Sequence, residues 1–256
     1  MNVEEPLSRA LRGRPVVILC GGRGVRLLPL TERVPKGMVR VNGKPLLEHV
    51  VAAYRRQGAE RFVLCTGYRG EVIRDHFATP PPGVEMLFSD IGPEAGMLQR
   101  LMAGRDRLPR GEGLLLAYCD TVINLDGDRL MESHRRAETW GTLVTATARS
   151  PFGLVRRDES GRVTAFDEKP TLTYYIGAML LEAAGLDEAT PEMIAAPDGA
   201  GLVALVQRLI ALGKLSSYQH DGLQVTINTP SEHQEAEAAL ARYYTYRESA
   251  GSGESL

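Results

Sequence analysis

Short apolar runs alternate with amphipathic stretches along the first 150 residues of the chain. Residues 15–20 are apolar throughout and end at a pair of glycines, which is typical of a strand buried on both faces of a parallel sheet. Residues 45–57 place apolar side chains at helical spacing, with Pro45 suited to a first helical turn and Gly58 to a helix end. The same reasoning predicts further strands over 61–66, 84–88, 114–118 and 142–148, and further helices over 71–77, 95–108 and 128–138.

The pattern changes after Pro151, where short strand-like segments become more frequent. Residues 152–156 and 161–166 are predicted as two strands, joined at the hairpin-turn signal of residues 158–161. The remaining pattern predicts strands over 173–181, 215–218 and 223–227, and helices over 202–212 and 230–244. Strands that alternate with helices favour an α/β fold with a mostly parallel sheet, and the second half adds a small antiparallel lobe.

Composition and charge exclude several classes of protein. A chain of 256 residues fits one domain, and a net charge of −2 offers no basic field to a nucleic-acid polymer. No apolar run reaches the roughly eighteen residues of a membrane span, and the polar N-terminus lacks the apolar core of a secretory signal. The three cysteines indicate reduced thiols in a cytoplasmic protein, because their number is odd and their spacing resembles no zinc site.

The segment after the first predicted strand carries the strongest chemical signal. Glycines at 21, 22 and 24 let backbone N–H groups approach phosphate oxygens closely. Arg23, Arg26 and Lys36 add positive charge, and Lys36 is one of only four lysines beside 26 arginines. The spacing matches neither a P-loop nor the dinucleotide fingerprint. We therefore predict a phosphate site, the alternative being a glycine-rich turn with solvated basic side chains.

Two further charged positions follow predicted strands. Asp120 comes just after strand 114–118, at the sheet edge where ligands bind, and one carboxylate with phosphate oxygens suits Mg²⁺. The alternative for Asp120 is an Asx turn or a helix N-cap before Thr121. Lys169 follows strand 161–166 and is a candidate for a second phosphate, although a lysine alone there is more typical of a solvated sheet edge.

These motifs, in this order, resemble the sugar-1-phosphate nucleotidyltransferases. The resemblance rests on Leu-Cys-Gly-Gly-Arg-Gly-Val-Arg-Leu at 19–27 with Pro35-Lys36, Gly-Lys-Pro-Leu-Leu-Glu-His at 43–49, Gly-Tyr-Arg-Gly at 67–70, Tyr-Cys-Asp at 118–120 and Glu-Lys-Pro at 168–170. It covers roughly residues 15–240. Segments 67–73 and 95–101 look most like the glucose-1-phosphate cytidylyltransferase branch.

The resemblance implies a fold and a division of the chain. The implied fold is a Rossmann-like three-layer sandwich of the nucleotide-diphospho-sugar transferase type. An N-terminal extension over 1–14 precedes a single nucleotidyltransferase domain over 15–245, and a disordered tail over 246–256 follows. Within the domain, residues 15–150 form the nucleotide-binding half, 151–229 the acceptor-binding lobe and 230–245 a closing helix.

The resemblance also implies a reaction and the residues that perform it. An NTP, with CTP favoured, reacts with a phosphorylated small molecule such as a sugar 1-phosphate, releasing pyrophosphate and forming a nucleotide sugar with Mg²⁺ as cofactor. The implied catalytic residues are Arg26, Lys36 and Asp120. The implied nucleotide-binding residues are Leu19, Cys20, Gly21, Gly22, Arg23, Gly24, Gly67 and Gly96. The implied acceptor-binding residues are Gly153, Glu168, Lys169 and Gly177. Relatives of this type commonly self-assemble, which allows a homo-oligomer, although the sequence itself does not determine the oligomeric state.

The chain also departs from the family pattern. Asn228 stands where the family places a second metal-binding Asp, so the implied metal ligands are Asp120 and the uncharged Asn228. Val25 and Gly37 replace a usual Thr and Pro, and residues 175–178 replace the usual Asn-Gly-Gly acceptor strand. Two alternatives follow from these departures: a cytidylyltransferase for a non-sugar phosphate or phosphonate, and a catalytically weak regulatory protein that binds nucleotide sugars.

Overall fold

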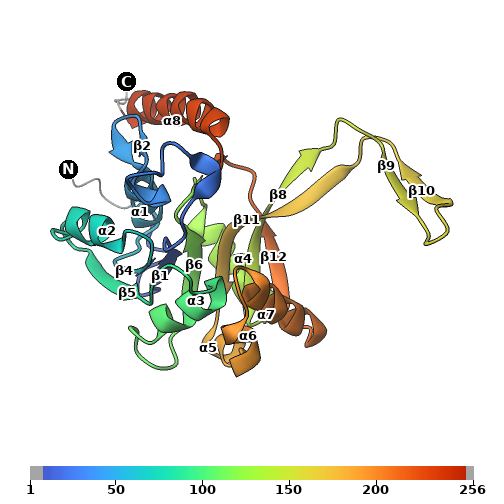
Figure 1. Ribbon diagram of the computed structural model, residues 1–256, viewed down its shortest axis with the longest axis horizontal. Helices are drawn as coiled ribbons and strands as arrows, with labels where there is room; N and C mark the ends of the chain where they lie inside the picture. Colours follow the sequence, from blue (N-terminus) through green and yellow to red (C-terminus); the bar gives the residue numbers. More distant parts are fainter. Residues whose placement is uncertain (1–7, 252–256) are drawn as a thin grey trace, which may run out of the picture.

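A seven-stranded sheet forms the centre of the molecule (Figure 1). The structure, a computed structural model, describes the backbone of residues 8–251 and the side chains of residues 8–241. The strand order is β12-β8-β11-β6-β1-β4-β5. In chain order, the bounds are β1 Val16–Leu19, β4 Arg61–Thr66, β5 Glu85–Asp90, β6 Leu114–Tyr118, β8 Gly141–Arg149, β11 Thr171–Leu181 and β12 Leu215–Gln219.

The sheet is mostly parallel, which confirms the predicted α/β class. Strands β6, β1, β4 and β5 run parallel to one another, and β12 runs parallel to β8. Strand β11 lies between β6 and β8 and is antiparallel to both. Every residue of β1 is buried, because this strand has neighbours on both sides and helices on both faces, and this burial explains its unbroken apolar run.

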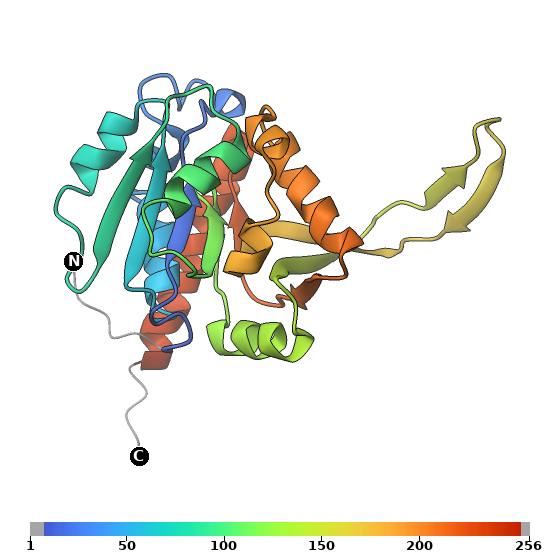
Figure 2. The same ribbon diagram turned by 90° about the horizontal axis from the view of Figure 1, so that it is seen from below.

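Helices cover both faces of the sheet and complete three layers (Figure 2). Alternate side chains of β1 enter opposite cores, with Val16 and Ile18 in one and Val17 and Leu19 in the other. The first core also contains side chains of α1 (Leu46–Arg55), α2 (Gly70–His76), α4 (Gly127–Ala137) and α8 (Pro230–Gly251). The second contains side chains of α3 (Met97–Arg105), α5 (Ala183–Leu186), α6 (Pro191–Ala195) and α7 (Ala200–Ala211).

Both ends of the domain differ from the prediction. Leu11, in the predicted extension, is fully buried, and its N–H donates to the Gln57 carbonyl at 2.8 Å. Helix α8 continues to Gly251, whereas the prediction ends it at 245 and places the tail after it. The helix continues because residues 246–250 contain no glycine or proline to stop it. Residues 1–7 and 252–256 lie outside the described residues, and none of the described helices is long and apolar enough to cross a bilayer.

Several short elements were not predicted. They are β2 (Arg40–Val41), β3 (Lys44–Pro45), β7 (Thr121–Ile123) and the short helices α5 and α6. All have five residues or fewer, which is too short for a hydrophobic period to appear in the sequence. The pairing of β7 with β13 (Gln224–Thr226) is important for the site, because it places Thr121 opposite Thr226.

A long antiparallel arm, residues 145–175, projects from the sheet (Figures 1 and 2). Its base is formed by the outer halves of β8 and β11, and its tip by β9 (Leu154–Arg157) and β10 (Val163–Asp167). Four large apolar side chains on the arm are more than half exposed: Phe152, Val155, Val163 and Phe166. The predicted antiparallel lobe is therefore this arm, whereas β11 and β12 complete the central sheet.

Candidate active site

Four polar side chains from distant parts of the sequence meet beyond the end of β6. Arg26 lies in the 3₁₀ helix η1 (Val25–Leu27) and Lys36 in the 3₁₀ helix η2 (Lys36–Met38). The Nζ of Lys36 donates to Oδ2 of Asp120 at 2.6 Å and to Oδ1 of Asn228 at 2.9 Å. Nη2 of Arg26 donates to the same Asn228 oxygen at 3.0 Å. These four residues, called here the Lys36 cluster, are the ones predicted to act in catalysis and metal binding.

Asp120 is fixed through its backbone and one carboxylate oxygen. The N–H of Ile227 donates to the Asp120 carbonyl at 3.0 Å, which ties the segment after β13 to the end of β6. The Thr121 hydroxyl donates to Oδ1 of Asp120 at 3.0 Å and lies 3.2 Å from the Thr226 hydroxyl. Oδ1 is thus oriented by β7, and Oδ2 faces Lys36.

Asn228 is fixed by the start of α8. The Glu232 carboxylate accepts hydrogen bonds from the N–H groups of Asn228 at 2.6 Å and Thr229 at 3.0 Å. The N–H of Glu232 donates in return to the Thr229 hydroxyl at 3.3 Å, which completes a capping box. The capping box holds the Asn228 backbone, so its side-chain carbonyl oxygen stays aimed at the two cations.

Lys36 is held in place by close packing at the next residue. The Lys36 side chain is only 13% exposed. A Cβ on Gly37 would lie 3.3 Å from the Cβ of Leu47 and 3.5 Å from the Cβ of Cys119. The glycine, one of the departures from the family pattern, therefore lets η2 pack directly on α1 and on the end of β6.

The Lys36 cluster carries an excess of positive charge, since Arg26 and Lys36 face a single carboxylate. The low exposure of Lys36 to water strengthens the attraction of its ammonium for an anion, whereas Arg26 is exposed. Phosphate oxygens are suitable anions, because guanidinium and ammonium groups donate charge-assisted hydrogen bonds to them. The arrangement can therefore bind and neutralise a polyphosphate.

The oxygens of Asp120 and Asn228 fit a divalent cation of the Mg²⁺ type. Both are hard oxygen ligands, and the Lys36 ammonium already bridges them, which shows that they converge on one position for a positive charge. Among residues 8–241, no three His, Cys, Asp or Glu side chains gather into a metal-binding group. A metal at this position would therefore take its remaining ligands from substrate phosphates and water.

The glycine loop, residues 21–24, requires glycine for two separate reasons. Gly24 adopts a left-handed backbone with φ +62°, which glycine adopts at little cost, and the turn is closed by the Thr31 hydroxyl donating to its carbonyl at 2.9 Å. A Cβ on Gly21 would overlap the guanidinium of Arg100, and a Cβ on Gly67 would meet the same group. The buried arginine, together with nearby backbone carbonyls, therefore leaves no room for a Cβ at Gly21 or Gly67.

Arg100 supports this loop and was not predicted as a site residue. Its side chain is almost fully buried, and it donates to the carbonyls of Thr66 and Gly92, each at 2.7 Å. Burial lowers the pKa of Arg100, although a guanidinium remains charged at any ordinary pH. The signal that could have found Arg100 is its position in α3 between the buried Leu98 and Leu101.

Two other residues predicted to bind nucleotide, Arg23 and Gly96, have contacts within the protein that also account for them. Arg23 forms an exposed ion pair with Glu94 at 2.7 Å, and its guanidinium lies over the Tyr68 ring at 5.5 Å from the centroid. An exposed pair of this kind contributes little stability, so Arg23 can exchange Glu94 for a phosphate at low cost. A Cβ on Gly96 would lie 2.5 Å from the Ala196 carbonyl oxygen, so packing alone already requires glycine there.

The three cysteines are buried free thiols beside the ligand edge of the sheet. Cys20, with Leu19, closes β1, and its thiol lies 3.3 Å from the Cys65 carbonyl oxygen. Burial raises the pKa of the Cys65 and Cys119 thiols to about 12, so both are protonated at neutral pH. They are not nucleophiles, and they act as small apolar side chains where strands approach the loops.

Of the residues predicted to bind the acceptor, Gly177 lies beside the Lys36 cluster. It has φ +82° and sits where the pairing of β11 with β8 is interrupted. A Cβ on Gly177 would lie 3.0 Å from the Tyr118 ring and 3.5 Å from the Thr121 hydroxyl. Gly177 thus keeps the surface beside Asp120 free of a side chain.

The other three, Gly153, Glu168 and Lys169, lie on the arm. The Lys169 ammonium is 3.8 Å from the Glu168 carboxylate, and both side chains are more than half exposed. Lys169 precedes Gly177 by eight residues, most of them in the extended strand β11, which corresponds to about 26 Å along the chain. The arm, which projects from the sheet in Figure 1, therefore carries Lys169 away from the end of the sheet where the Lys36 cluster lies.

Comparisons with known proteins were made on both sequence and structure. The family model described as nucleotidyl transferase matches residues 15–180. The UTP–glucose-1-phosphate uridylyltransferase AglF of Haloferax volcanii is 30% identical over 237 residues, which are 88% of this chain and 95% of that protein. The glucose-1-phosphate cytidylyltransferase of Salmonella typhimurium is 28% identical over 240 residues, 83% of this chain and 90% of that protein.

Solved structures share the fold. HddC from Yersinia pseudotuberculosis superposes with a TM-score of 0.68 at 20% identity, covering 89% of this chain and 99% of HddC. A UDP-glucose pyrophosphorylase complexed with UDP-glucose superposes with a TM-score of 0.66 at 17% identity, covering 90% of this chain and 99% of that one. At these identities, the likeness extends to the fold and no further.

The contact between Gly21 and Arg100 can be tested by a double-mutant cycle. We expect Arg100→Leu to lower the free energy of unfolding by about 2–4 kcal/mol, because two buried carbonyls lose their donor. Gly21→Ala should cost about 1–3 kcal/mol through overlap with the guanidinium. In the double variant, the total cost should fall short of the sum by at least about 1 kcal/mol, measured by urea denaturation.

Gly22→Ala is the matched control, because no atom lies within 4 Å of its Cβ position. It should change the stability by less than about 0.5 kcal/mol. Additive costs for Gly21→Ala and Arg100→Leu would contradict the account of the loop.

Proposed function

This chain belongs to the nucleotidyl transferase family, and from that premise we propose that it transfers a nucleotidyl group from an NTP to the phosphate of a small acceptor. The products are pyrophosphate and, when the acceptor is a sugar 1-phosphate, a nucleotide sugar. The observation that carries the proposal is the convergence of Arg26, Lys36 and Asp120 next to the glycine loop. This convergence suits the binding of a triphosphate whose far end must leave as an anion.

In the proposed reaction, an oxygen of the acceptor phosphate forms a bond to the α-phosphorus of the NTP. The bond from that phosphorus to the bridging oxygen of the β-phosphate breaks, and its electron pair leaves with pyrophosphate. Both reactants are anions, so the protein's task is to bring them together and to neutralise charge. No side-chain nucleophile is needed for such a transfer.

The residues divide this task between them. Lys36 and Arg26 bind the triphosphate and stabilise the negative charge that grows on the leaving pyrophosphate. Asp120 and Asn228 would hold Mg²⁺, which when bound neutralises further phosphate charge. The backbone of the glycine loop provides N–H donors for the nucleotide, and Gly67, which lies against Arg100, continues that surface at the end of β4.

We propose CTP as the favoured donor. The resemblance of segments 67–73 and 95–101 to the cytidylyltransferase branch supports this choice. UTP is the competing donor, because the uridylyltransferase of Haloferax volcanii is 30% identical to this chain over 88% of its length. A pyrophosphate-release screen of the four NTPs against sugar 1-phosphates decides between them.

We also propose that the protein is cytoplasmic and that its partners are small molecules. Three buried free thiols support a cytoplasmic protein. A net charge of −2 supports small-molecule partners over a nucleic-acid polymer.

We further propose that the protein is a homo-oligomer in which the arm of one copy reaches the site of another. The exposed Phe152 and Phe166 support this assembly, because a two-stranded ribbon with apolar side chains in water is marginally stable by itself. Lys169 would then bind the acceptor phosphate in the neighbouring copy, with Glu168 and Gly153 beside it.

A second candidate function is a catalytically weak regulatory protein that binds nucleotide sugars. Asn228 is the observation in its favour. Its uncharged side-chain oxygen already accepts hydrogen bonds from both Lys36 and Arg26, so it attracts a divalent cation less strongly than a carboxylate would.

The catalytic assignment is tested by removing single members of the Lys36 cluster. Lys36→Ala and Asp120→Ala should each lower the rate of pyrophosphate release by at least about 100-fold, because a buried charge beside the phosphates is lost. Lys36→Arg should also lower it by more than about 10-fold, since the larger planar guanidinium does not fit the position of the compact ammonium between the Asp120 and Asn228 oxygens. Lys44→Ala, an exposed lysine on β3, is the control and should keep full activity. Normal turnover by folded Lys36→Ala and Asp120→Ala proteins would overturn the assignment.

The two candidate functions are separated by Asn228→Asp. For an active enzyme, we expect this change to lower the Mg²⁺ concentration at half-maximal rate by about 10-fold, since a carboxylate binds the ion more strongly than an amide. The measurement is pyrophosphate release against Mg²⁺ concentration. A wild-type protein that is inactive with every NTP and acceptor, together with an Asn228→Asp variant that gains activity, would favour the regulatory function.

The proposed exchange of arms is tested by mixing two inactive variants. Lys36→Ala lacks a functional Lys36 cluster and Lys169→Ala lacks the acceptor lysine, so a mixed assembly contains some sites with both residues intact. Co-expression should restore activity to about a quarter of the wild-type level for a randomly mixed dimer. Lys36→Ala mixed with Asp120→Ala should restore none, because both changes lie in the same cluster. Failure of the first mixture to recover activity would show that Lys169 does not act across subunits.

A further inference from the structure

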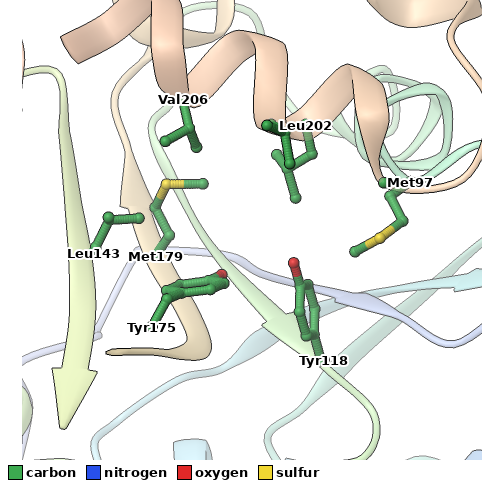
Figure 3. Close-up of a pocket in the computed structure, with 9 residues that line it drawn as sticks. Met97, Tyr118, Leu143, Tyr175, Met179, Leu202 and Val206 are labelled. Carbon is green, nitrogen blue, oxygen red and sulfur yellow. The ribbon is translucent and has the colours of Figure 1, made fainter. Parts of the chain in front are cut away.

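A cavity of about 220 Å³ lies between the sheet and helix α7 (Figure 3). The side chains of Tyr118, Leu143, Tyr175 and Met179 form its floor on the sheet, and Leu202 of α7 covers it. No charged side chain lines it. Its surface is therefore apolar except for the two phenol hydroxyls.

The cavity adjoins the Lys36 cluster. Tyr118 is the last residue of β6 and comes two residues before Asp120. The ring of Tyr118 also lies against Gly177, since a Cβ on that glycine would be 3.0 Å from the ring. Because Gly177 has no side chain, the surface between the Tyr118 ring and Asp120 stays open. A molecule whose phosphate lies at the cluster can thus extend into the cavity past Tyr118.

The cavity and the glycine loop lie on opposite sides of Asp120. The loop follows β1, and Gly67 follows β4, whereas the sheet side of the cavity is built on β6, β11 and β8. Met97, at the start of α3 and next to Gly96, lines the cavity at its end nearest the nucleotide side. In the order of the sheet, β6 separates the two regions. Because the proposed function assigns the glycine loop to the nucleotide, the acceptor needs a separate site, and the cavity is a candidate for it.

The polar groups of the cavity are few. The Tyr175 hydroxyl is buried and has no hydrogen-bond partner of good geometry, and the Tyr118 ring stands edge-on to Tyr175 at 6.0 Å between centroids. Burial raises the pKa of Tyr118 to about 12, so its hydroxyl is a neutral donor at physiological pH. The Tyr175 hydroxyl has almost no exposed surface, so the cavity offers a ligand few hydrogen bonds, and each unpaired hydroxyl of a ligand buried there would cost about 1–3 kcal/mol.

We propose that this cavity takes the organic group of the acceptor, and that this group is a ring or chain with few hydroxyls rather than a fully hydroxylated hexose. The inference rests on the proposed nucleotidyl transfer. The volume suffices for a six-membered ring, since a cavity of about 150 Å³ holds benzene. Each further hydroxyl of a hexose would enter without a partner at a cost of about 1–3 kcal/mol, whereas apolar carbon gains by leaving water.

A matched pair of ring phosphates tests the proposal. Cyclohexyl phosphate and glucose 1-phosphate both carry a phosphate on a six-membered ring, but only the second bears ring hydroxyls. Isothermal titration of the full chain should give a Kd at least about tenfold lower for cyclohexyl phosphate, a difference of about 1.4 kcal/mol. With CTP and Mg²⁺ present, kcat/KM for pyrophosphate release should follow the same order. A Kd for glucose 1-phosphate equal to or below that of cyclohexyl phosphate would overturn the proposal.

A substitution on α7 tests whether the cavity causes the preference for cyclohexyl phosphate over glucose 1-phosphate. Val206 lines the cavity, and Val206→Thr adds a hydroxyl at nearly unchanged shape, so it should narrow the preference for cyclohexyl phosphate by about 3-fold or more. Ile210→Thr, one turn further along the same helix at an exposed position outside the cavity, is the control and should leave the ratio unchanged. An unchanged ratio in Val206→Thr would show that the discrimination arises elsewhere.

Two further outcomes separate this inference from the proposed function. Saturating CTP should leave the affinity for cyclohexyl phosphate unchanged or higher, and exclusion of cyclohexyl phosphate by CTP would assign the cavity to the nucleotide base and overturn the inference. If neither acceptor supports pyrophosphate release with any NTP, the proposed function fails, but the titration still decides whether the cavity prefers an apolar phosphate.

Discussion

The Lys36 ammonium, held between Asp120 and Asn228, is the contact on which the rest of the site depends. It joins the loop between β1 and α1, the end of β6 and the start of α8, three segments that the sheet alone does not bring together. A partly buried ion pair is stabilising only when its geometry is well supported. Each member here has separate support, from the packing at Gly37, the backbone bond of Ile227 to Asp120, and the capping box of α8.

Around this contact, the two proposed substrate sites lie on different strands of the sheet. The proposed nucleotide side, after β1 and β4, has glycines at 21 and 67 that lie against the buried guanidinium of Arg100. The other side, at β6, β11 and β8, is a cavity of apolar side chains. Asp120 follows β6, the strand between them, so the Lys36 cluster lies where the two proposed sites meet. The arm lies outside this division, and Lys169 on it is the residue proposed to reach the site of a neighbouring copy.

Much of the fold follows from local sequence, whereas the details of the site follow from contacts between distant segments. Strands β4 and β6 have the predicted bounds, because their apolar runs are flanked by clear breaks. The Lys36 cluster was anticipated because its residues belong to motifs with recognisable spacing. Arg100 was missed because a charged residue within a helix normally faces solvent, and its burial depends on carbonyls contributed by two other loops. The distance of Lys169 from the cluster could not be predicted, because nothing in the sequence sets the length of the arm beyond the sheet.

The most direct test of the central claim observes the Lys36 side chain itself. The chain has only four lysines, so a sample labelled with ¹³C at the lysine ε-carbons gives a spectrum in which each signal can be assigned by a single Lys→Arg substitution. The account predicts that saturating CTP with Mg²⁺ shifts the Lys36 signal, because its ammonium then exchanges contacts with the Asp120 and Asn228 oxygens for contacts with phosphate oxygen, while the signals of Lys44 and Lys214 stay in place. A Lys36 signal that does not move when the nucleotide is bound would contradict the account.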